Sequence, residues 1–384
     1  MQSIAENYWE KSTSANMTLS IQKKKPHHET RNGIGIHLNC SPANTKLTCP
    51  SNDFPSRLDD SHNQDRSSKR QHPTCPDYFR WIHEDLSPWR RTGVTQEMVE
   101  RAKVKAEFRL VIVDGKVYVD TYSKSRYQRD IFTQWGVVQL LRRYPGKMPD
   151  LDIMFHMRDR PVIKKNLYPQ PGGKAPPPLF GYDGNDDTFD IAFPDWSFWG
   201  WSRHGLKPWA ALLKDFKKAE QSSKWVDREK HAYWKGSLLT RDRVDLAKCN
   251  VSGKQDWNAR IYVAARSIGK AASKFVQEEM KMDYVYDYMF HLLKSYGDLF
   301  KYKPRIPPKA VQLCLESMAC PTSGLKKKYL MESRIKGPSD SPPCSMPPPY
   351  DPRTHGSILR TKRNITKLVE AWEKQHWDTQ KKHI

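Results

Sequence analysis

The amino-acid sequence predicts an α/β fold, and three local patterns in its 384 residues carry that prediction. Two β-branched runs flank Asp114-Gly115, a pair that is typical of a two-residue type I′ hairpin turn. From residue 126 to 144 the apolar spacing becomes that of an amphipathic helix. A short loop then leads into an alternating apolar run at 151–155, which predicts a buried strand. Helix, short loop and buried strand in this order favour an α/β domain.

The elements on either side of this unit are predicted from the same kinds of signal. A dense aromatic segment at 75–89 predicts a short helical element, and the helix predicted at 95–106 begins with Thr95 as its N-cap. Further amphipathic helices are predicted at 207–218, 267–300 and 363–376. Residues 166–187 form a long loop rich in proline and glycine, which is uncommon in a compact domain unless the loop is functional.

The composition indicates a folded, basic protein with polar flanks. Hydrophobic residues make up only 37% of the chain, yet it holds 13 Trp, 17 Tyr and 13 Phe, too many aromatic residues for a disordered chain. The formal net charge of +22 is compatible with nucleic acid, an acidic membrane surface or anionic substrates such as sugar nucleotides. The basic residues are spread along the whole chain without a nucleic-acid-binding motif, so we expect no nucleic-acid partner.

Seven cysteines occur without any CxxC pair, which argues against a zinc site. Six of them lie in the polar flanks: Cys40, Cys49, Cys75, Cys314, Cys320 and Cys344. Cysteines in segments with so little apolar core favour disulfides formed in an oxidising compartment. The seventh is Cys249, and the odd count leaves one thiol without a partner or signals a missing segment.

A polar cluster follows the predicted strand at 151–155 and ends at Pro161: His156-Met157-Arg158-Asp159-Arg160. In open α/β sheets, ligands and catalytic residues lie beyond the carboxyl ends of the strands, so a carboxylate at this place is a candidate catalytic group. The competing interpretation is that Asp159 only pairs with Arg158 or Arg160 and holds the loop, because structural ion pairs are commoner than active sites.

Four aromatic residues fall within six positions after the long loop: Trp196, Phe198, Trp199 and Trp201. Flat aromatic faces stack on sugar rings and on apolar partners, so Trp196, Phe198 and Trp199 are candidates for an acceptor-binding surface. Core packing with one exposed ring explains the same pattern equally well.

A second candidate for substrate binding lies at 231–237, where a short predicted strand runs into a glycine turn. Arg241 and Arg243 open the helix that follows. Glycine lets backbone amides approach an anion, and a cationic side chain beside a helix N-terminus favours phosphate. Most such turns merely connect two elements, so this pattern alone is a weak predictor.

Several long motifs occur along the chain, and the resemblance that they carry covers about residue 36 to the end: CPDYFRWIHEDLSPW, HMRDRP, FPDWSFWGW, YWKGS…R, CNVSGKQDWNAR, IGKAASKFVQEEMKMDYVYDYMFHLL and CPTSGLKKKYLMES…MPPPYDP. Together with the hairpin they resemble plant members of the Rumi-like protein O-glucosyltransferases, which belong to the capsule-associated glycosyltransferase family 90. The resemblance implies a GT-B architecture, in which two Rossmann-like lobes face each other across a cleft. It also implies transfer of glucose or xylose from a UDP-sugar to a hydroxyl of a protein or glycan.

The resemblance assigns roles to particular residues. The family's catalytic aspartate falls on Asp159, whose carboxylate would accept the proton of the attacking hydroxyl, with inversion at the anomeric carbon. The family's donor-binding positions fall on Lys235, Gly236, Ser237 and Arg243. Positive charge at these positions would stabilise the departing UDP. The resemblance implies no metal or other cofactor, and a place in the lumen of the ER or Golgi.

One departure from the family pattern concerns the second lobe. The segment IYVAA at 261–265 runs straight into RSIGK at 266–270, where a complete lobe needs on the order of 100 residues or more. We therefore divide the chain into a polar leader (1–72), an acceptor-side α/β lobe with the catalytic loop and the start of the donor lobe (73–265), and a truncated remnant of the donor lobe (266–384). Neither a signal peptide nor the membrane anchor usual in plant relatives is visible in the sequence.

Two explanations of the incomplete lobe compete. Lost exons would leave an inactive, poorly folded chain, and we favour this explanation because removing strands from a parallel sheet exposes unpaired edges. Alternatively, the chain is a divergent, non-catalytic carbohydrate- or protein-binding remnant of the family. A nucleic-acid-binding function would rest on charge alone.

Overall fold

The computed structural model describes Leu38, Cys40, Cys49 and residues 73–123, 127–169, 172–223 and 272–381. All of these residues belong to one compact unit, Leu38–Ile384. The predicted polar leader, residues 1–72, therefore lies outside the described residues apart from three positions. The predicted boundary between 265 and 266 lies outside them as well.

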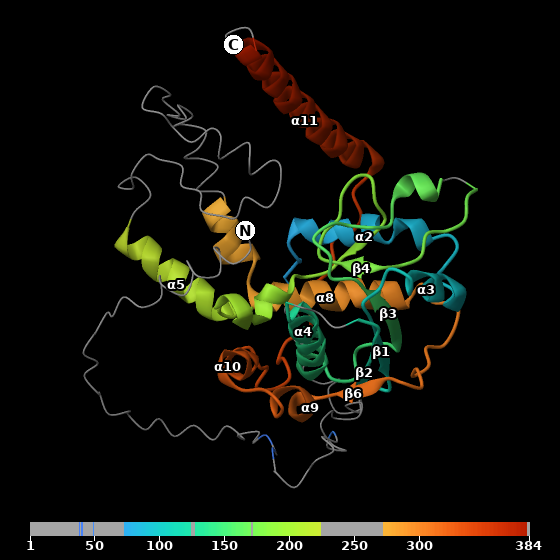
Figure 1. Ribbon diagram of the computed structural model, residues 1–384, viewed down its shortest axis with the longest axis vertical. Helices are drawn as coiled ribbons and strands as arrows, with labels where there is room; N and C mark the ends of the chain where they lie inside the picture. Colours follow the sequence, from blue (N-terminus) through green and yellow to red (C-terminus); the bar gives the residue numbers. More distant parts are fainter. Residues whose placement is uncertain are drawn as a thin grey trace. The chain divides into compact units, whose positions relative to one another are not determined.

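A mixed sheet is the framework of the described part of the chain (Figure 1). Its strands lie in the order β5-β4-β3-β1-β2-β6. The bounds are Phe108–Val113 (β1), Lys116–Thr121 (β2), Leu151–Phe155 (β3), Phe180–Gly181 (β4), Ile191–Ala192 (β5) and Val311–Leu313 (β6). β3, β4 and β5 run parallel, whereas β1 is antiparallel to both of its neighbours and β6 is antiparallel to β2. The predicted α/β class is confirmed.

The hairpin between β1 and β2 is confirmed at the predicted residues. Asp114 and Gly115 have φ angles of 48° and 71°, both in the left-handed region that a type I′ turn requires. The backbone N–H of Asp114 donates a hydrogen bond to Oδ1 of Asp150, at 3.0 Å. This bond ties the turn to the residue that precedes β3.

The α-helices of the described chain are α2 (Trp81–Asp85), α3 (Gln96–Ala102), α4 (Arg129–Arg143), α5 (Trp209–Ser222), α8 (Met282–Gly297), α9 (Leu315–Ala319), α10 (Gly324–Glu332) and α11 (Pro352–Lys381). Three of them, α3, α4 and α5, confirm helices that the sequence predicts. Thr95 caps α3 as predicted, because its side chain accepts a hydrogen bond from the backbone N–H of Met98.

Two predicted helices differ from the structure. The segment predicted as one helix at 267–300 is interrupted: a π-helical turn at Phe275–Glu279 (η9) is followed by an extended Lys281, after which α8 begins. The carbonyl groups at the break accept hydrogen bonds from distant side chains, Glu279 from Tyr78 and Met280 from Trp209. Helix α11 begins at Pro352, 11 residues before the predicted start at 363. Proline suits the first position of a helix, and Oδ1 of Asp351 caps the helix by accepting hydrogen bonds from the backbone N–H groups of the next two residues after Pro352.

Helix α4 lies in the core, with buried residues on almost all of its faces. Gly136 makes this packing possible, because a Cβ atom at this position would lie 2.5 Å from Cζ2 of the Trp199 side chain. On the other side of Trp199, its Nε1–H donates a hydrogen bond to the hydroxyl of Tyr286 in α8, at 2.9 Å. The described residues after 271 therefore share one core with those before 224.

Three disulfides join the two flanks of the chain, as the sequence predicts for these cysteines. They connect Cys40 with Cys320, Cys49 with Cys314 and Cys75 with Cys344. Each bond links residues more than 260 positions apart in the sequence. Cys249, the remaining cysteine, lies outside the described residues. Every helix within the described ranges is too short or too polar to span a lipid bilayer.

We expect Gly136→Ala to destabilise the protein although alanine favours helices. In a free helix this substitution stabilises by about 1 kcal/mol. Here the added methyl group would overlap the ring of Trp199. We therefore expect the free energy of unfolding to fall by about 1–3 kcal/mol, measured by urea denaturation. Gly337→Ala is the control, because nothing lies within 4 Å of a Cβ at that position. An unchanged or higher stability of Gly136→Ala would show that Trp199 does not pack there.

Removal of the Cys75–Cys344 disulfide by the double substitution to alanine is expected to lower the free energy of unfolding by about 2–5 kcal/mol. The physical reason is the long loop that this bond closes. Denaturation under non-reducing conditions measures the effect, and Cys249→Ala is the control that removes none of the described disulfides. Peptide mapping without reductant should recover the three pairs, and a cross-link from Cys249 to any of these six cysteines would contradict the assignment.

Candidate functional site at the carboxyl edge of the parallel strands

The carboxyl ends of β3, β4 and β5 meet at one edge of the sheet, because these strands are parallel. The loop that contains Asp159 follows β3, Tyr182 follows β4, and Asp195 and Trp196 follow β5 by a few residues. Arg129, the first residue of α4, reaches the same edge through its side chain. This is the place where open α/β sheets collect ligand-binding groups.

Carboxylates from two other elements hold both ends of the Asp159 loop. At its start, Oε2 of Glu107 accepts a hydrogen bond from the backbone N–H of Met157, at 2.8 Å. At its end, the carboxylate of Asp190 accepts hydrogen bonds from the N–H groups of Val162 (2.9 Å) and Ile163 (2.8 Å). The loop backbone is therefore fixed on either side of Asp159.

His156 anchors the same loop from inside the sheet. Its side chain is fully buried, and its Nε2 lies 3.1 Å from Oδ1 of Asp190. The ring lies directly over Gly181 in β4, where a Cβ atom would come within 2.2 Å of Nε2. Glycine at this position is thus required by the close approach of the His156 ring.

Asp159 is displayed on the surface and forms an ion pair with Arg129. Its side chain is 81% exposed, and its Oδ1 lies 2.6 Å from Nη1 of the arginine, whose side chain is only 11% exposed. The same Nη1 donates a hydrogen bond to the carbonyl oxygen of Met157, at 2.8 Å. The structural ion pair considered from the sequence is therefore present, but its partner is Arg129 and not Arg158 or Arg160. The partner was missed because it is distant in sequence.

Three aromatic rings surround the guanidinium group of Arg129. It lies 4.3 Å from the ring centre of Trp196, with Tyr127 at 5.5 Å and Trp201 at 5.8 Å. The indole N–H of Trp201 donates a hydrogen bond to the carbonyl of Tyr127, which holds two of the rings together. An arginine in the first turn of a helix faces the positive end of the helix dipole, and this unfavourable placement is the sequence signal that could have identified it.

The three predicted acceptor-binding aromatic residues differ in their exposure and in the groups that they contact. Trp199 is fully buried in the core, and Trp196 is 8% exposed between Arg129 and Tyr182. Phe198 is half-buried and lines a cavity. For Trp199 the structure agrees with the core-packing interpretation of the sequence and leaves no free ring face for stacking on an acceptor.

Asp195 and Tyr182 add buried ionisable groups to this edge. Burial raises the pKa of Asp195, against the hydrogen bonds from Ser197, whose backbone N–H donates to Oδ1 at 2.8 Å. Burial also raises the pKa of Tyr182, whose hydroxyl contacts that of Thr133 in α4. Tyr182 packs edge-on against Trp196, and Asp195 caps the short turn Trp196–Trp199, so both groups support the ring that lies over Arg129. Asp159 remains the exposed carboxylate of the loop.

The four predicted donor-binding residues lie outside the described residues: Lys235, Gly236, Ser237 and Arg243. Their roles therefore stay predictions.

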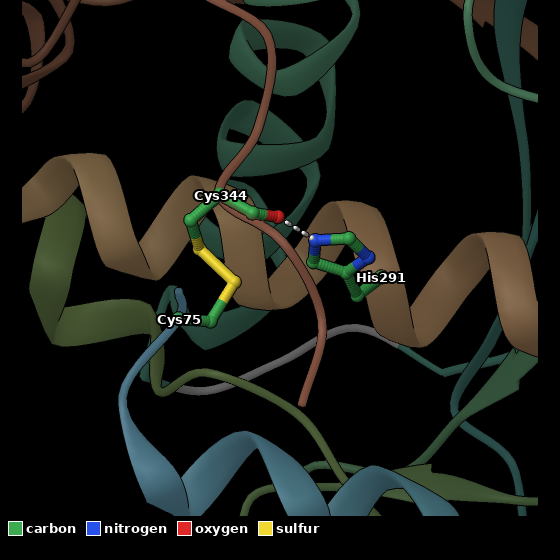
Figure 2. Close-up of side chains that lie close together, drawn as sticks. All are labelled: Cys75, His291 and Cys344. Carbon is green, nitrogen blue, oxygen red and sulfur yellow. Dashed lines mark hydrogen bonds between the residues drawn. A yellow bond between two sulfur atoms is a disulfide. The ribbon is translucent and has the colours of Figure 1, made fainter. Parts of the chain in front are cut away.

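One cluster in the described chain has the spacing of a metal site. Ligand atoms of Cys75, His291 and Cys344 lie within 4.8 Å of one another. Figure 2 shows that the two sulfur atoms are bonded to each other and that the His291 ring points to the carbonyl oxygen of Cys344, at 2.8 Å. A disulfide offers no thiolate to a metal, so this cluster joins the chain ends and packs the core.

The profile of Glycosyl transferase family 90 matches this chain in two stretches, residues 70–266 and 263–373. The chain is 25% identical to Protein O-glucosyltransferase 1 of Bos taurus over 240 residues and to that of Homo sapiens over 238 residues, 56% of each chain in both cases. It is 22% identical to O-glucosyltransferase rumi of Drosophila melanogaster over 209 residues, 50% of this chain and 48% of that protein. The chain thus aligns with about half the length of these curated relatives.

Arg129→Met should loosen the Asp159 loop. The substitution keeps an apolar side chain against Trp196 but removes the bonds to Asp159 and to the Met157 carbonyl. We expect amide hydrogen exchange in a peptide covering residues 156–163 to become about 2–10-fold faster. Arg143→Met, which removes the ion pair with Asp283 at the opposite end of α4, is the matched control. Equal exchange in both variants would show that Arg129 does not hold the loop.

Proposed function

Because the chain belongs to glycosyl transferase family 90, we propose that it transfers a sugar, glucose or xylose, from a UDP-sugar to a hydroxyl group of a protein or glycan, with Asp159 as the general base. The observation that carries the proposal is the exposed Asp159 carboxylate, on a fixed loop at the carboxyl edge of three parallel strands. The names of the relatives in cattle and humans support a protein acceptor, and the name of the fly relative supports transfer of glucose to a hydroxyl oxygen.

In this proposal the two oxygens of Asp159 have separate tasks. Oδ1 is held by Arg129, which orients the carboxylate, and Oδ2 accepts the proton of the acceptor hydroxyl. The acceptor oxygen forms a bond with the anomeric carbon while the bond from that carbon to the UDP oxygen breaks. The electron pair of the broken bond leaves with UDP, so attack from the opposite face inverts the configuration.

The donor would be held by residues that only the family resemblance assigns. Lys235 and Arg243 supply positive charge to the departing diphosphate, and the backbone at Gly236 and Ser237 approaches it closely. Phe198 is our candidate for acceptor contact, because its ring is half-buried and faces a cavity. The proposal includes no metal ion or other cofactor.

We further infer that the chain is a shortened member of a two-lobed GT-B architecture of the plant type. The two stretches matched by the family profile meet at residues 263–266, the junction where the sequence predicts that part of the donor lobe is missing. The three disulfides support folding in an oxidising compartment such as the ER or Golgi lumen.

A second candidate function is a non-catalytic carbohydrate- or protein-binding remnant. It is favoured by the closed core of the described residues, in which the segments before and after the undescribed 224–271 pack together and are tied by disulfides. A lobe that is complete without the rest of the donor side could persist as a binding module. UDP-sugar turnover distinguishes the two functions.

A UDP-sugar hydrolysis and transfer assay on the purified chain tests the proposal. Asp159→Asn keeps the shape of the side chain but removes the base, so we expect turnover to fall by about 10²–10⁴-fold. Asp183→Asn, an exposed carboxylate in the loop after β4, is the control.

If turnover appears only after a complete donor lobe is grafted after Arg260, the chain is a shortened copy of a working enzyme. Asp159→Asn is then tested in the grafted protein. Turnover that survives Asp159→Asn would refute its role as the base. A chain that stays inactive even with the lobe restored would favour the binding remnant.

A further inference from the structure

A cavity of about 630 Å³ lies beside the edge strand β5, and Phe198 is the one lining residue to which the proposed transfer reaction gives a role. Its walls come from α2, the loop at 184–190, the segment at 192–198, α8 and the first turns of α11. Asp190, which holds the end of the Asp159 loop, is one of its lining residues. The volume is that of a site for a small organic ligand.

Aromatic rings line much of this cavity: Tyr78, Trp81, Phe189, Phe193, Phe198 and Tyr288. The face of an aromatic ring carries partial negative charge, so a cluster of rings attracts a cation that has lost part of its water. Tyr78 and Tyr288 lie 6.1 Å apart between ring centres, and neither is free to turn away because both pack against Phe79.

More acidic than basic side chains line the cavity, although the whole chain carries a formal net charge of +22. Four carboxylates line it, those of Glu84, Asp85, Asp186 and Asp190, against two ammonium groups. Both ammonium groups are bound at Asp186: Lys165 donates to its carbonyl at 2.8 Å and Lys362 to its Oδ1 at 2.7 Å. Asp190 is engaged by backbone amides, and Glu84 faces His355 at 3.7 Å.

The contacts above involve three of the four carboxyl groups and do not include the fourth, that of Asp85. Burial is the largest influence on Asp85 and raises its pKa to about 7, and the neighbouring negative charge of Glu84 also raises the pKa. A hydrogen bond from the backbone of Ala192 and the positive charge of Lys165 act in the opposite direction. Tyr288 lines the cavity from α8, and burial, together with the charge of Asp85, raises the pKa of its hydroxyl. A desolvated carboxylate without an adjacent positive charge is costly, and a bound cation would remove that cost.

We propose that this cavity binds an organic ammonium ion, with its alkyl groups against the aromatic rings and its charge at Asp85. The inference does not depend on glycosyl transfer. Two sources could provide the same chemistry: a free amine such as choline, or the side chain of a lysine presented by another polypeptide. The matched probes below distinguish them.

The protonation of Asp85 gives the proposal a pH dependence with a definite sign. The ligand binds the carboxylate form, so affinity is full above pH 7 and falls by about tenfold per pH unit below it. The other titratable or charged groups that line the cavity are Glu84, Asp186, Asp190, Lys165, Lys362, His355, Tyr78 and Tyr288. Asp85→Asn separates the contribution of Asp85 from theirs.

Calorimetric titration of the full chain tests the proposal with pairs of probes in which the charged ammonium group is replaced by carbon or removed. Choline is compared with neohexanol, in which a carbon atom replaces the nitrogen, and Nα-acetyl-lysine methylamide with its norleucine counterpart. We expect at least one cation to bind about tenfold or more tightly than its neutral partner at pH 8. Asp85→Asn should abolish this preference and its pH dependence, whereas Asp215→Asn, an exposed carboxylate paired with Lys207, should leave both unchanged.

The comparison of charged and neutral probes uses the natural chain, so it does not depend on whether Asp85→Asn folds. Preference for choline alone identifies a small-amine site, and preference for the lysine probe alone identifies a docking site for a polypeptide. Binding of neither cation, equal binding of a cation and its neutral partner, or a preference that survives in folded Asp85→Asn would overturn the proposal.

Discussion

Burial of helix α4 is the constraint on which the rest of this structure depends. A helix that buries polar residues is stable in a core only if most of its polar groups find hydrogen-bond partners. Segments from the far end of the chain provide several of them. Gln139 accepts a hydrogen bond from the backbone N–H of Ile335, and the indole N–H of Trp135 donates to Ser333. The chain after residue 271 thus supplies part of the core in which α4 packs, and the three disulfides fix that arrangement covalently.

The same constraint builds the candidate site. Because α4 is held in the core, its first residue, Arg129, is fixed at the carboxyl edge of β3, β4 and β5. There the guanidinium group is confined between aromatic rings, and its Nη1 donates to the Met157 carbonyl and pairs with Asp159. An exposed carboxylate on a loop becomes oriented by a buried cation. The candidate site and the packed core therefore share Arg129, Trp196 and Asp190.

The sequence predicted local structure well wherever a short-range rule controls the outcome. The positive φ angles at Asp114 and Gly115, the cap at Thr95 and the buried strand β3 all follow from the residues themselves. Predictions over longer ranges were weaker. The break before α8 depends on hydrogen bonds from Tyr78 and Trp209, which no local pattern reveals. The aromatic cluster at 196–201 allowed two interpretations because its spacing does not say which ring meets α4.

The sequence alone determined the α/β class, the presence of disulfides in the flanks and the candidate loop around Asp159, because these depend on composition, on spacing and on motifs. Only the tertiary structure decided which cysteines pair, which arginine holds Asp159 and where the Trp199 ring lies. The physical reason is that each of these is a contact between residues far apart in the chain. Such contacts are selected by the packing of α4 and the order of the strands, and neither is written in any single stretch of residues.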